Sequence, residues 1–402
     1  MTFSVARAVA TAAVVALVAA CGGTDSPTAS PEAAQGATPS AHAGHATYPN
    51  PPSAPLRAGE RFQTLTMPNP YTPDPPTAGG TDDYRCFLVD PGLTQRTILT
   101  GSQFLPQNSA VVHHAIFFRV NPGDVAEAKQ LDADSPGDGW TCFGGTGIKG
   151  RGRGLSALGG AAWITSWAPG GGERFAPKGT GVVLEPGTQV VMQIHYNLLA
   201  TGGQATGSDK SSLKLRVGPP GLKVQPLNTS LLVAPIELPC APGESGALCD
   251  RATSTIDSIR RYGEGSGRMI AGLNLLCNNG RKPVPGPTHS CDRPAQADIV
   301  VRAAAGHMHL LGRSIRLEVN PGTPKAQVLL DVPVYNFDDQ GARELATPVA
   351  VKRGDVLRVT CTYDATLRSK LPELKPLKPR YVLWGEGTSD EMCLGVMLYT
   401  AT

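Results

Sequence analysis

"AVVHHAIFFRV", residues 110–120, is a run of β-branched, aromatic and small residues that contains two adjacent histidines, His113 and His114. Such a run predicts a buried or half-buried β-strand. Neighbouring side chains of a regular strand point to opposite faces of the sheet. If both rings serve one site, the strand cannot be regular there. We then expect a bulge or twist at His113–His114 that turns both rings toward one point.

Short strand-like runs recur through the rest of the chain. Its 402 residues include 47 Gly and 36 Pro, only 5% are aromatic, and few stretches have a helical period of apolar residues. This composition predicts many turns between short strands. We therefore expect an all-β protein with two consecutive antiparallel β-sandwich (jelly-roll-like) domains. A Gly/Pro-rich hinge, "GPPG" at 218–221, sets the expected domains at residues 59–218 and 219–402.

The N-terminus predicts export from the cytoplasm. Residues 1–20 carry one charge, Arg7, before a short apolar run, which is typical of a signal peptide. "LVAAC" followed by glycine resembles the lipobox of bacterial lipoproteins and predicts lipidation of Cys21; an ordinary secretion signal cut near Cys21 is the alternative. Residues 21–58 are rich in Ala, Pro, Ser and Thr and predict a flexible tether. We expect a lipid-anchored protein of the cell envelope, on a periplasmic or outer-membrane face.

Charge and motifs exclude several function classes. The net charge of +3 over the chain gives no concentrated basic surface, so no nucleic-acid partner is expected. "GTGIKG" at 145–150 matches a dinucleotide motif but lies among turn residues, which predicts a plain loop. The sequence has neither a P-loop nor a G-x-S-x-G motif. We expect a small-molecule substrate.

Eight cysteines follow Cys21, and none forms a C-x-x-C motif. Outside the cytoplasm, an even number of cysteines predicts disulfides, here four. The eight are Cys86, Cys142, Cys240, Cys249, Cys277, Cys291, Cys361 and Cys393.

Five of the eight histidines lie in apolar, strand-like surroundings: His113, His114, His195, His307 and His309. The last two, at i and i+2 in "GHMHLLG", share a face if they lie on a strand. A single strand histidine is more often a satisfied core residue than a ligand. Burying five imidazoles is costly unless each has a partner, and a bound metal ion supplies one. Of the others, His42 and His45 belong to the tether, and "GPTHSC" predicts a turn at His289.

Copper is the metal that fits these histidines best. Imidazole suits Zn, Cu, Fe and Ni. The sequence has no H-E-x-x-H, and no Asp or Glu lies within three residues of the five histidines, which disfavours a zinc protease and a two-histidine, one-carboxylate iron site. Methionine thioethers favour Cu(I). The candidate thioethers are Met192, Met308, Met392 and Met397.

Four motifs then occur in order: "VVHHAIFFRV" (111–120), "MQIHYN" (192–197), "GHMHLLG" (306–312) and "GTSDEMCLGVMLY" (387–399). Together they resemble the type II copper, ascorbate-dependent monooxygenases, which include peptidylglycine α-hydroxylating monooxygenase and dopamine β-monooxygenase. The resemblance extends over roughly residues 80–402, nearly the whole predicted folded part.

The resemblance implies two copper ions per chain, one in each domain. The first, electron-transfer site would be held by His113, His114 and His195. The second, oxygen-binding and catalytic site would be held by His307, His309 and Met392. Tyr84 and Gln193 match positions near the first site and would support it. The resemblance also implies the disulfides Cys86–Cys142 and Cys361–Cys393. Three pairings remain open for Cys240, Cys249, Cys277 and Cys291.

The departures from the family concern the substrate. The peptide-hydroxylating members carry an arginine and an asparagine that hold the substrate carboxylate, where this chain has Ala305 and Leu394. A tyrosine of those enzymes is replaced by Val396. We therefore do not expect a glycine-extended peptide as substrate, and we expect a less polar pocket.

The predicted function is that of a copper-dependent monooxygenase. It would hydroxylate a C–H bond of an organic substrate with O2 and a one-electron reductant such as ascorbate. The alternative is a non-catalytic copper-binding or copper-handling cell-envelope lipoprotein. An adhesion or scaffold sandwich with structural histidines is a further alternative. We expect a monomer that contacts the membrane only through its lipid anchor.

Overall fold

The computed structural model describes residues 50–77, 80–149, 163–169 and 171–402. The predicted signal peptide, Cys21 and tether residues 21–49, with His42 and His45, lie outside the described residues. The described strands pair antiparallel, except that β8 and β11 are parallel, and the all-β class is confirmed. Within the described part of the chain, no helix has the length and hydropathy that crossing a membrane requires.

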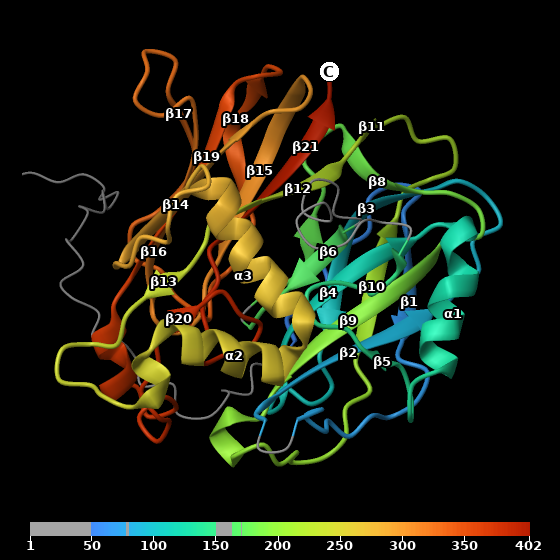
Figure 1. The fold of residues 1–402 in the computed structure, drawn as a ribbon. Coiled ribbons are helices and arrows are strands. Elements are labelled where there is room, and N and C mark those ends of the chain that lie inside the picture. Colours follow the sequence, from blue (N-terminus) through green and yellow to red (C-terminus); the bar gives the residue numbers. More distant parts are fainter. Residues whose placement is uncertain (1–49, 78–79, 150–162, 170) are drawn as a thin grey trace, which may run out of the picture. The chain divides into compact units, whose positions relative to one another are not determined.

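Residues 61–226 form two sheets (Figure 1). One is five-stranded, in the order β5-β2-β9-β4-β6, and the other is six-stranded, in the order β1-β10-β3-β8-β11 with β7 on β3. Their strands are β1 (Arg61–Thr66), β2 (Asp82–Val89), β3 (Thr97–Leu105), β4 (Val112–Val120), β5 (Trp140–Thr141), β6 (Trp163–Trp167), β7 (Arg174–Phe175), β8 (Thr180–Leu184), β9 (Gln189–Asn197), β10 (Ser212–Val217) and β11 (Gln225–Pro226).

The two sheets share one apolar core. Phe117 and Met192 from the five-stranded sheet pack in it with Phe104 and Leu213 from the six-stranded sheet. Each such burial stabilises the fold by about 1.5–3 kcal/mol. Because successive side chains of a strand alternate, Met192 faces this core while His195, three residues along β9, faces the opposite side. The histidines of β4 and β9 therefore lie on the outer face of the five-stranded sheet.

Residues 228–401 form the remaining sheets. Two have four strands, in the orders β12-β21-β15-β18 and β14-β19-β16-β17, and a third pairs β13 with β20. Val301 and Met397 from the first share a core with Leu317 and Val359 from the second. Their strands are β12 (Asn228–Val233), β13 (Glu237–Leu238), β14 (Thr288–Pro294), β15 (Ile299–His307), β16 (Gly312–Val319), β17 (Gln327–Val332), β18 (Arg343–Val351), β19 (Val356–Tyr363), β20 (Val382–Leu383) and β21 (Leu394–Ala401).

Helices are few, as expected, but two of them adjoin each other in a region where no strand was predicted. These are α2 (Arg251–Tyr262) and α3 (Glu264–Cys277), and α1 (Val125–Ala133) lies on the five-stranded sheet (Figure 1). Asp250 caps α2 by accepting a hydrogen bond from the Thr253 N–H. Such a cap stabilises a helix by about 1 kcal/mol. Short 3-10 helices lie at Pro122–Asp124, Leu199–Thr201, Ala247–Cys249 and Ala365–Ser369.

The eight cysteines from Cys86 onward form four disulfides, as predicted. Cys86–Cys142 and Cys361–Cys393 have the pairing that the family resemblance implied. The other four cysteines, for which three pairings were open, form the disulfides Cys240–Cys249 and Cys277–Cys291. Disulfides of this density are typical of proteins that fold outside the reducing cytoplasm.

The turn predicted at His289 was wrong. His289 lies on β14, opposite Cys361 of β19, and is buried rather than in a turn. Its Nε2 accepts a hydrogen bond from the Glu237 N–H at 3.2 Å. The turn residues that precede it, Gly286 and Pro287, end just before the strand begins.

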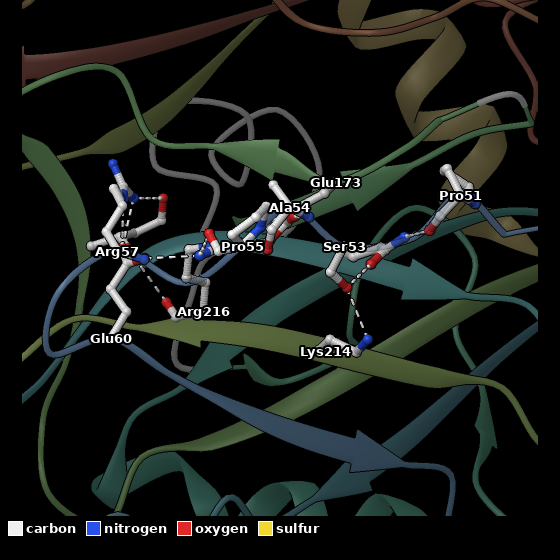
Figure 2. Close-up of polar contacts among 11 residues, drawn as sticks. Pro51, Ser53, Ala54, Pro55, Arg57, Glu60, Glu173, Lys214 and Arg216 are labelled. Carbon is white, nitrogen blue, oxygen red and sulfur yellow. Dashed lines mark hydrogen bonds and ion pairs between the residues drawn. The ribbon is translucent and has the colours of Figure 1, made fainter.

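A buried arginine fastens the segment at residues 51–60 to the six-stranded sheet (Figure 2). The side chain of Arg216 on β10 has no exposed surface and pairs with Glu60 and Glu173, both at 2.8 Å. It also donates to the carbonyl oxygens of Ala54 and Pro55. Glu173 in turn accepts from the Ala54 N–H at 2.7 Å. This network holds the start of the folded chain against β10 and β7.

Replacing Arg216 with methionine should therefore destabilise the protein strongly. Buried Glu173 would lose its cation and Glu60 would keep only Arg57, which costs about 3–5 kcal/mol in the free energy of unfolding. Urea unfolding of the R216M variant measures the loss. Lys214→Met is the matched control, because Lys214 lies two residues earlier on β10 and gives up a hydrogen bond to Ser53 and a cation–π contact with Phe62 but no ion pair with a buried carboxylate. Equal losses in the two variants would contradict the importance of this network.

Candidate metal centre

The two adjacent histidines of β4 lie at an irregularity in the strand. Val112 pairs with Tyr196 of β9 and His114 pairs with His195, so the register shifts between them and His113 is the extra residue. The predicted bulge is confirmed. It removes the alternation that would send the two rings to opposite faces. Their Nδ1 atoms are 3.1 Å apart.

Three imidazoles meet at this bulge. The Nδ1 atom of His195 is 3.3 Å from Nδ1 of His114, and all three rings can offer ligand atoms within 4.8 Å of one another. We call His113, His114 and His195 the first histidine group. Three ring nitrogens this close need a proton or a cation between them, because lone pairs that face one another repel. The geometry is that of a metal-binding group built from one bulged strand and its neighbour.

A carboxylate fixes which nitrogen His195 presents. Asp82 at the start of β2 lies 2.9 Å from His195 Nε2 through its Oδ1 atom. Burial raises the pKa of Asp82, but interactions that include the hydrogen bonds from His195 and Thr388 outweigh it and the net pKa is lowered, so Asp82 is ionised. His195 Nε2 is therefore the donor and its Nδ1 carries the free lone pair. Carboxylates commonly hold metal-binding histidines in this way.

Sequence reasoning missed Asp82. No acidic residue lies within three positions of any of the five histidines, and Asp82 is 113 positions from His195 in the chain. Only the pairing of β2 with β9 brings them together, with Tyr84 directly opposite His195. The two-residue spacing of Asp82 and Tyr84 would have been the available signal, had the register of the two strands been known.

Both predicted supporting residues lie at the first group. The ring of Tyr84 stacks on His195, with 4.0 Å between centroids and 12° between planes. Its hydroxyl donates to the Glu386 carbonyl oxygen at 2.8 Å. Gln193, two residues before His195 on β9, donates from Nε2 to the carbonyl oxygen of Cys142. Gln193 thus connects β9 to the Cys86–Cys142 disulfide rather than to a histidine.

His307 and His309 form a second histidine group, but not on one strand as predicted. β15 ends at His307, and His309 lies in the turn that leads to β16. The hydroxyl of Tyr335 replaces the strand ladder here, because it accepts from the Met308 N–H and donates to the Met308 carbonyl oxygen. The two rings still adjoin, with 5.1 Å between centroids.

Hydrogen bonds at Nδ1 leave Nε2 as the ligand atom of both rings in the second group. His307 Nδ1 bonds to Gln340 Oε1, and His309 Nδ1 bonds to the Asp390 carbonyl oxygen at 3.1 Å. The Nε2 atom of His309 is buried and has no hydrogen-bond partner among the residues that the structure describes. A buried nitrogen without a partner is costly, and a metal ion would remove that cost.

Met392, the predicted third ligand, lies in a segment that is tied to His309. The carboxylate of the preceding residue, Glu391, accepts hydrogen bonds from the N–H groups of His309 and Leu311. The following residue, Cys393, is in the disulfide with Cys361. Met392 itself is buried, and its carbonyl oxygen accepts from the Tyr363 hydroxyl. Ligation by the Met392 thioether stays a prediction.

The two histidine groups touch. The rings of His114 and His307 meet edge to face with 5.6 Å between centroids. The loop between β17 and β18 contacts both groups, since Phe337 stacks on His113 and Gln340 bonds to His307. All five strand histidines of the sequence analysis are therefore brought into one continuous cluster.

Burial keeps three histidines of the cluster, His114, His307 and His309, uncharged in the absence of metal. It lowers the pKa of His307 to about 4 and that of His309 to about 3. The pKa of His114 is also well below its usual value, first through burial and then through neighbouring histidines. Neutral imidazole is the form that binds metal ions, so the cluster is ready to bind them near pH 7.

The all-β fold and the histidine cluster place this chain among candidate metalloproteins. Comparison with known proteins narrows that class. Residues 288–402 match the model of the copper type II ascorbate-dependent monooxygenase C-terminal domain. The chain thus carries the C-terminal domain of that family, which confirms the family predicted from the four motifs. The match includes His307, His309 and Met392, while the first histidine group lies outside it.

DBH-like monooxygenase protein 2 from Mus musculus is 34% identical over 104 residues, which cover 26% of this chain and 15% of that protein. The matched stretch is thus a small part of the relative's length. Among solved structures, allantoicase aligns over 86% of this chain and 90% of its own, with a TM-score of 0.19 and 9% identity. A Paenibacillus xanthan lyase aligns over 84% and 26%, with a TM-score of 0.17 and 11% identity.

The Asp82–His195 hydrogen bond yields a test of the first group. Asp82→Asn should weaken copper binding there by about 10- to 100-fold, because His195 loses the partner that sets its tautomer. Competition with a copper chelator measures the affinity. Thr388→Val is the control, since it removes a different hydrogen bond to the same Asp82 oxygen. If both variants bind copper like the unaltered protein, Asp82 does not orient His195.

The lowered histidine pKa values predict an acid-sensitive metal-free fold. Unfolded histidine takes up a proton near pH 6.5, whereas native His309 does so only near 3. Between these values the unfolded state binds more protons, so stability present above pH 6.5 is lost as the pH falls. In urea unfolding from pH 6.5 to 4.5, His309→Asn should lose less stability than the unaltered protein, by up to about 1.4 kcal/mol per pH unit. Parallel profiles would contradict this.

Proposed function

We propose that this chain is a copper-dependent monooxygenase that hydroxylates a C–H bond of a small organic substrate. The observation that carries the proposal is the convergence of three Nδ1 atoms, 3.1 and 3.3 Å apart at His114, next to a second histidine pair. In that pair, the buried Nε2 atom of His309 has no hydrogen-bond partner among the described residues. The C-terminal domain of a copper monooxygenase family in the same chain supports copper as the metal.

The residues divide the work between two copper sites. His113, His114 and His195 would hold one ion, and His307, His309 and Met392 would hold the other. Bound copper would supply one-electron transfer and the activation of O2, with ascorbate or a similar compound as the reductant. The overall balance is one C–H bond, one O2, two electrons and two protons giving an alcohol and water.

The chain's own residues set the geometry and the surroundings of the substrate. Asp82, Gln340 and the Asp390 carbonyl hold three rings in place. Along β15 and β21, His307 pairs with Leu394 and Ala305 pairs with Val396. Ala305, Leu394 and Val396 are apolar and stand where the peptide-hydroxylating enzymes carry polar side chains. The part of the substrate that lies next to them is therefore a hydrocarbon group.

The proposal includes a place in the cell. Four disulfides support folding outside the cytoplasm. A signal peptide at residues 1–20, lipid on Cys21 and a tether shorter than the predicted 21–58, because residues 51–58 are bound to the six-stranded sheet, would anchor a monomer to the cell envelope, facing its small-molecule substrate and O2. Metabolic labelling with a radioactive fatty acid, and its loss in Cys21→Ser, tests the anchor.

Copper content and product formation test the function together. The unaltered protein should bind about two copper ions per chain, by metal analysis after dialysis. His113→Ala and His309→Ala should each retain about one. With ascorbate and O2, only the unaltered protein should oxygenate members of a broad C–H substrate panel, with one ¹⁸O atom from ¹⁸O2 in each product.

Other outcomes point elsewhere. Two bound copper ions without product across the panel would favour a copper-handling lipoprotein that does not turn over. Absence of stoichiometric copper would leave the histidines as structural residues and overturn the proposal.

A further inference from the structure

A cleft of about 230 Å³ lies beside the second histidine group. One wall is the segment from Ala168 to Arg174, without residue 170, and the other is the loop from Asp339 to Ala342. The volume is below the roughly 300–1,000 Å³ of pockets for drug-sized ligands. The cleft therefore holds a small molecule or one end of a larger one.

The cleft adjoins the second histidine group directly. Gln340, which lines the cleft, is the residue whose Oε1 atom bonds to Nδ1 of His307. Its Nε2 atom donates to the carbonyl oxygen of Phe337, the residue stacked on His113. A molecule in the cleft thus contacts a side chain that contacts a candidate copper ligand.

Arg174 supplies the positive charge of the cleft. Burial lowers the pKa of Arg174, and the negative charge of Asp339 acts in the opposite direction. No residue in the described part of the chain accepts a hydrogen bond from its guanidinium group or forms an ion pair with it within 4.0 Å. A Cβ atom on Gly341 would be 3.8 Å from Arg174 Nη2, so the group extends across the cleft to the opposite loop.

The network around Arg216 holds this wall in place. Glu173, next to Arg174, is fixed by Arg216 and by the Ala54 N–H (Figure 2). Both oxygens of the Glu173 carboxylate are thereby engaged, one by Arg216 and the other by the Ala54 N–H, so Glu173 does not compete for Arg174. Strand β7, which includes Arg174, pairs with Gly101 and Ser102 of β3. A guanidinium on a rigid wall, with no acceptor among the described residues, is suited to bind a carboxylate in a bidentate manner.

We propose that this cleft binds the carboxylate end of the substrate and that Arg174 is the residue that recognises it. The inference rests on the proposed function and deepens it. Apolar Leu394 and Val396 near His307 receive the hydrocarbon part, while Arg174 receives the charged end. The substrate class is a small aliphatic or aromatic carboxylate that is oxygenated at a carbon away from its carboxyl group.

Three probes of equal length and different charge test the recognition. Calorimetric titration of the metal-free full chain with pentanoate, pentanamide and pentylammonium should show preference for pentanoate. Arg174→Gln should weaken pentanoate binding by about ten- to hundredfold, since a hydrogen bond to a charged group is lost, and leave pentanamide binding nearly unchanged. Arg174→Lys should recover part of the loss. Asp339→Asn should strengthen pentanoate binding, because a like charge is removed.

A second readout tests whether the cleft serves the copper centre. Cu(II) in the second histidine group should broaden the proton signals of bound pentanoate, with more broadening at the methyl end than next to the carboxylate. Arg96→Gln is the matched control, because Arg96 lies in an exposed pair with Glu185. It should change neither probe binding nor broadening. Thermal unfolding of each variant separates a binding defect from a folding defect.

Each result has one meaning. Preference for pentylammonium, or an equal loss of all three probes in Arg174→Gln, overturns carboxylate recognition. Pentanoate binding without broadening on a copper-loaded chain overturns the role in the reaction. If no copper binds while pentanoate still depends on Arg174, the proposed function fails and carboxylate recognition by the cleft stands.

Discussion

The hydrogen bonds at the carboxylate of Asp82 are the constraint on which the histidine cluster depends. The Oδ1 atom is bonded to His195 Nε2 and accepts from the N–H and hydroxyl groups of Thr388, while Oδ2 accepts from Thr81. A buried carboxylate is stable only when its oxygens are satisfied in this way. The orientation of His195 and the position of Thr388 are therefore set by one group, although they lie nearly 200 residues apart in the chain.

Thr388 belongs to a segment, residues 384–392, that contacts His309 of the second histidine group and the residues Asp82 and Tyr84 that support the first. Its Glu386 carbonyl accepts from Tyr84, its Asp390 carbonyl binds His309, and its Glu391 carboxylate holds the turn at His309. Helix α2 fixes the segment from outside, because Arg261 pairs with Asp390 at 2.7 Å. Gly387 lies so close to this helix that a Cβ atom would be 2.0 Å from the Tyr262 hydroxyl oxygen. The helices that the sequence did not predict thus position the segment that ends in Met392.

The sequence predicted those parts of the protein that depend on local pattern. Alternation and β-branched runs located β4, β9, β15, β19 and β21, and the condition that the two adjacent histidines on one of them serve one site predicted a bulge. The partners of the histidines could not be predicted. Asp82, Gln340 and the Asp390 carbonyl each come from another element, and their contacts exist only once strand register and loop paths are fixed. His309 shows the same limit, since Tyr335 and Glu391 hold it in a turn where the pattern predicted a strand.

The partners also make the two histidine groups electrostatically different. The first group has a full negative charge at His195, because Asp82 is ionised. The second group is backed by neutral acceptors, an amide oxygen at His307 and a carbonyl oxygen at His309. A nearby negative charge favours the more highly charged form of a cation, and neutral donors favour it less. With His114 and His307 in ring contact, these two environments lie side by side. A more oxidised metal ion would therefore be favoured in the first histidine group, and a more reduced one in the second.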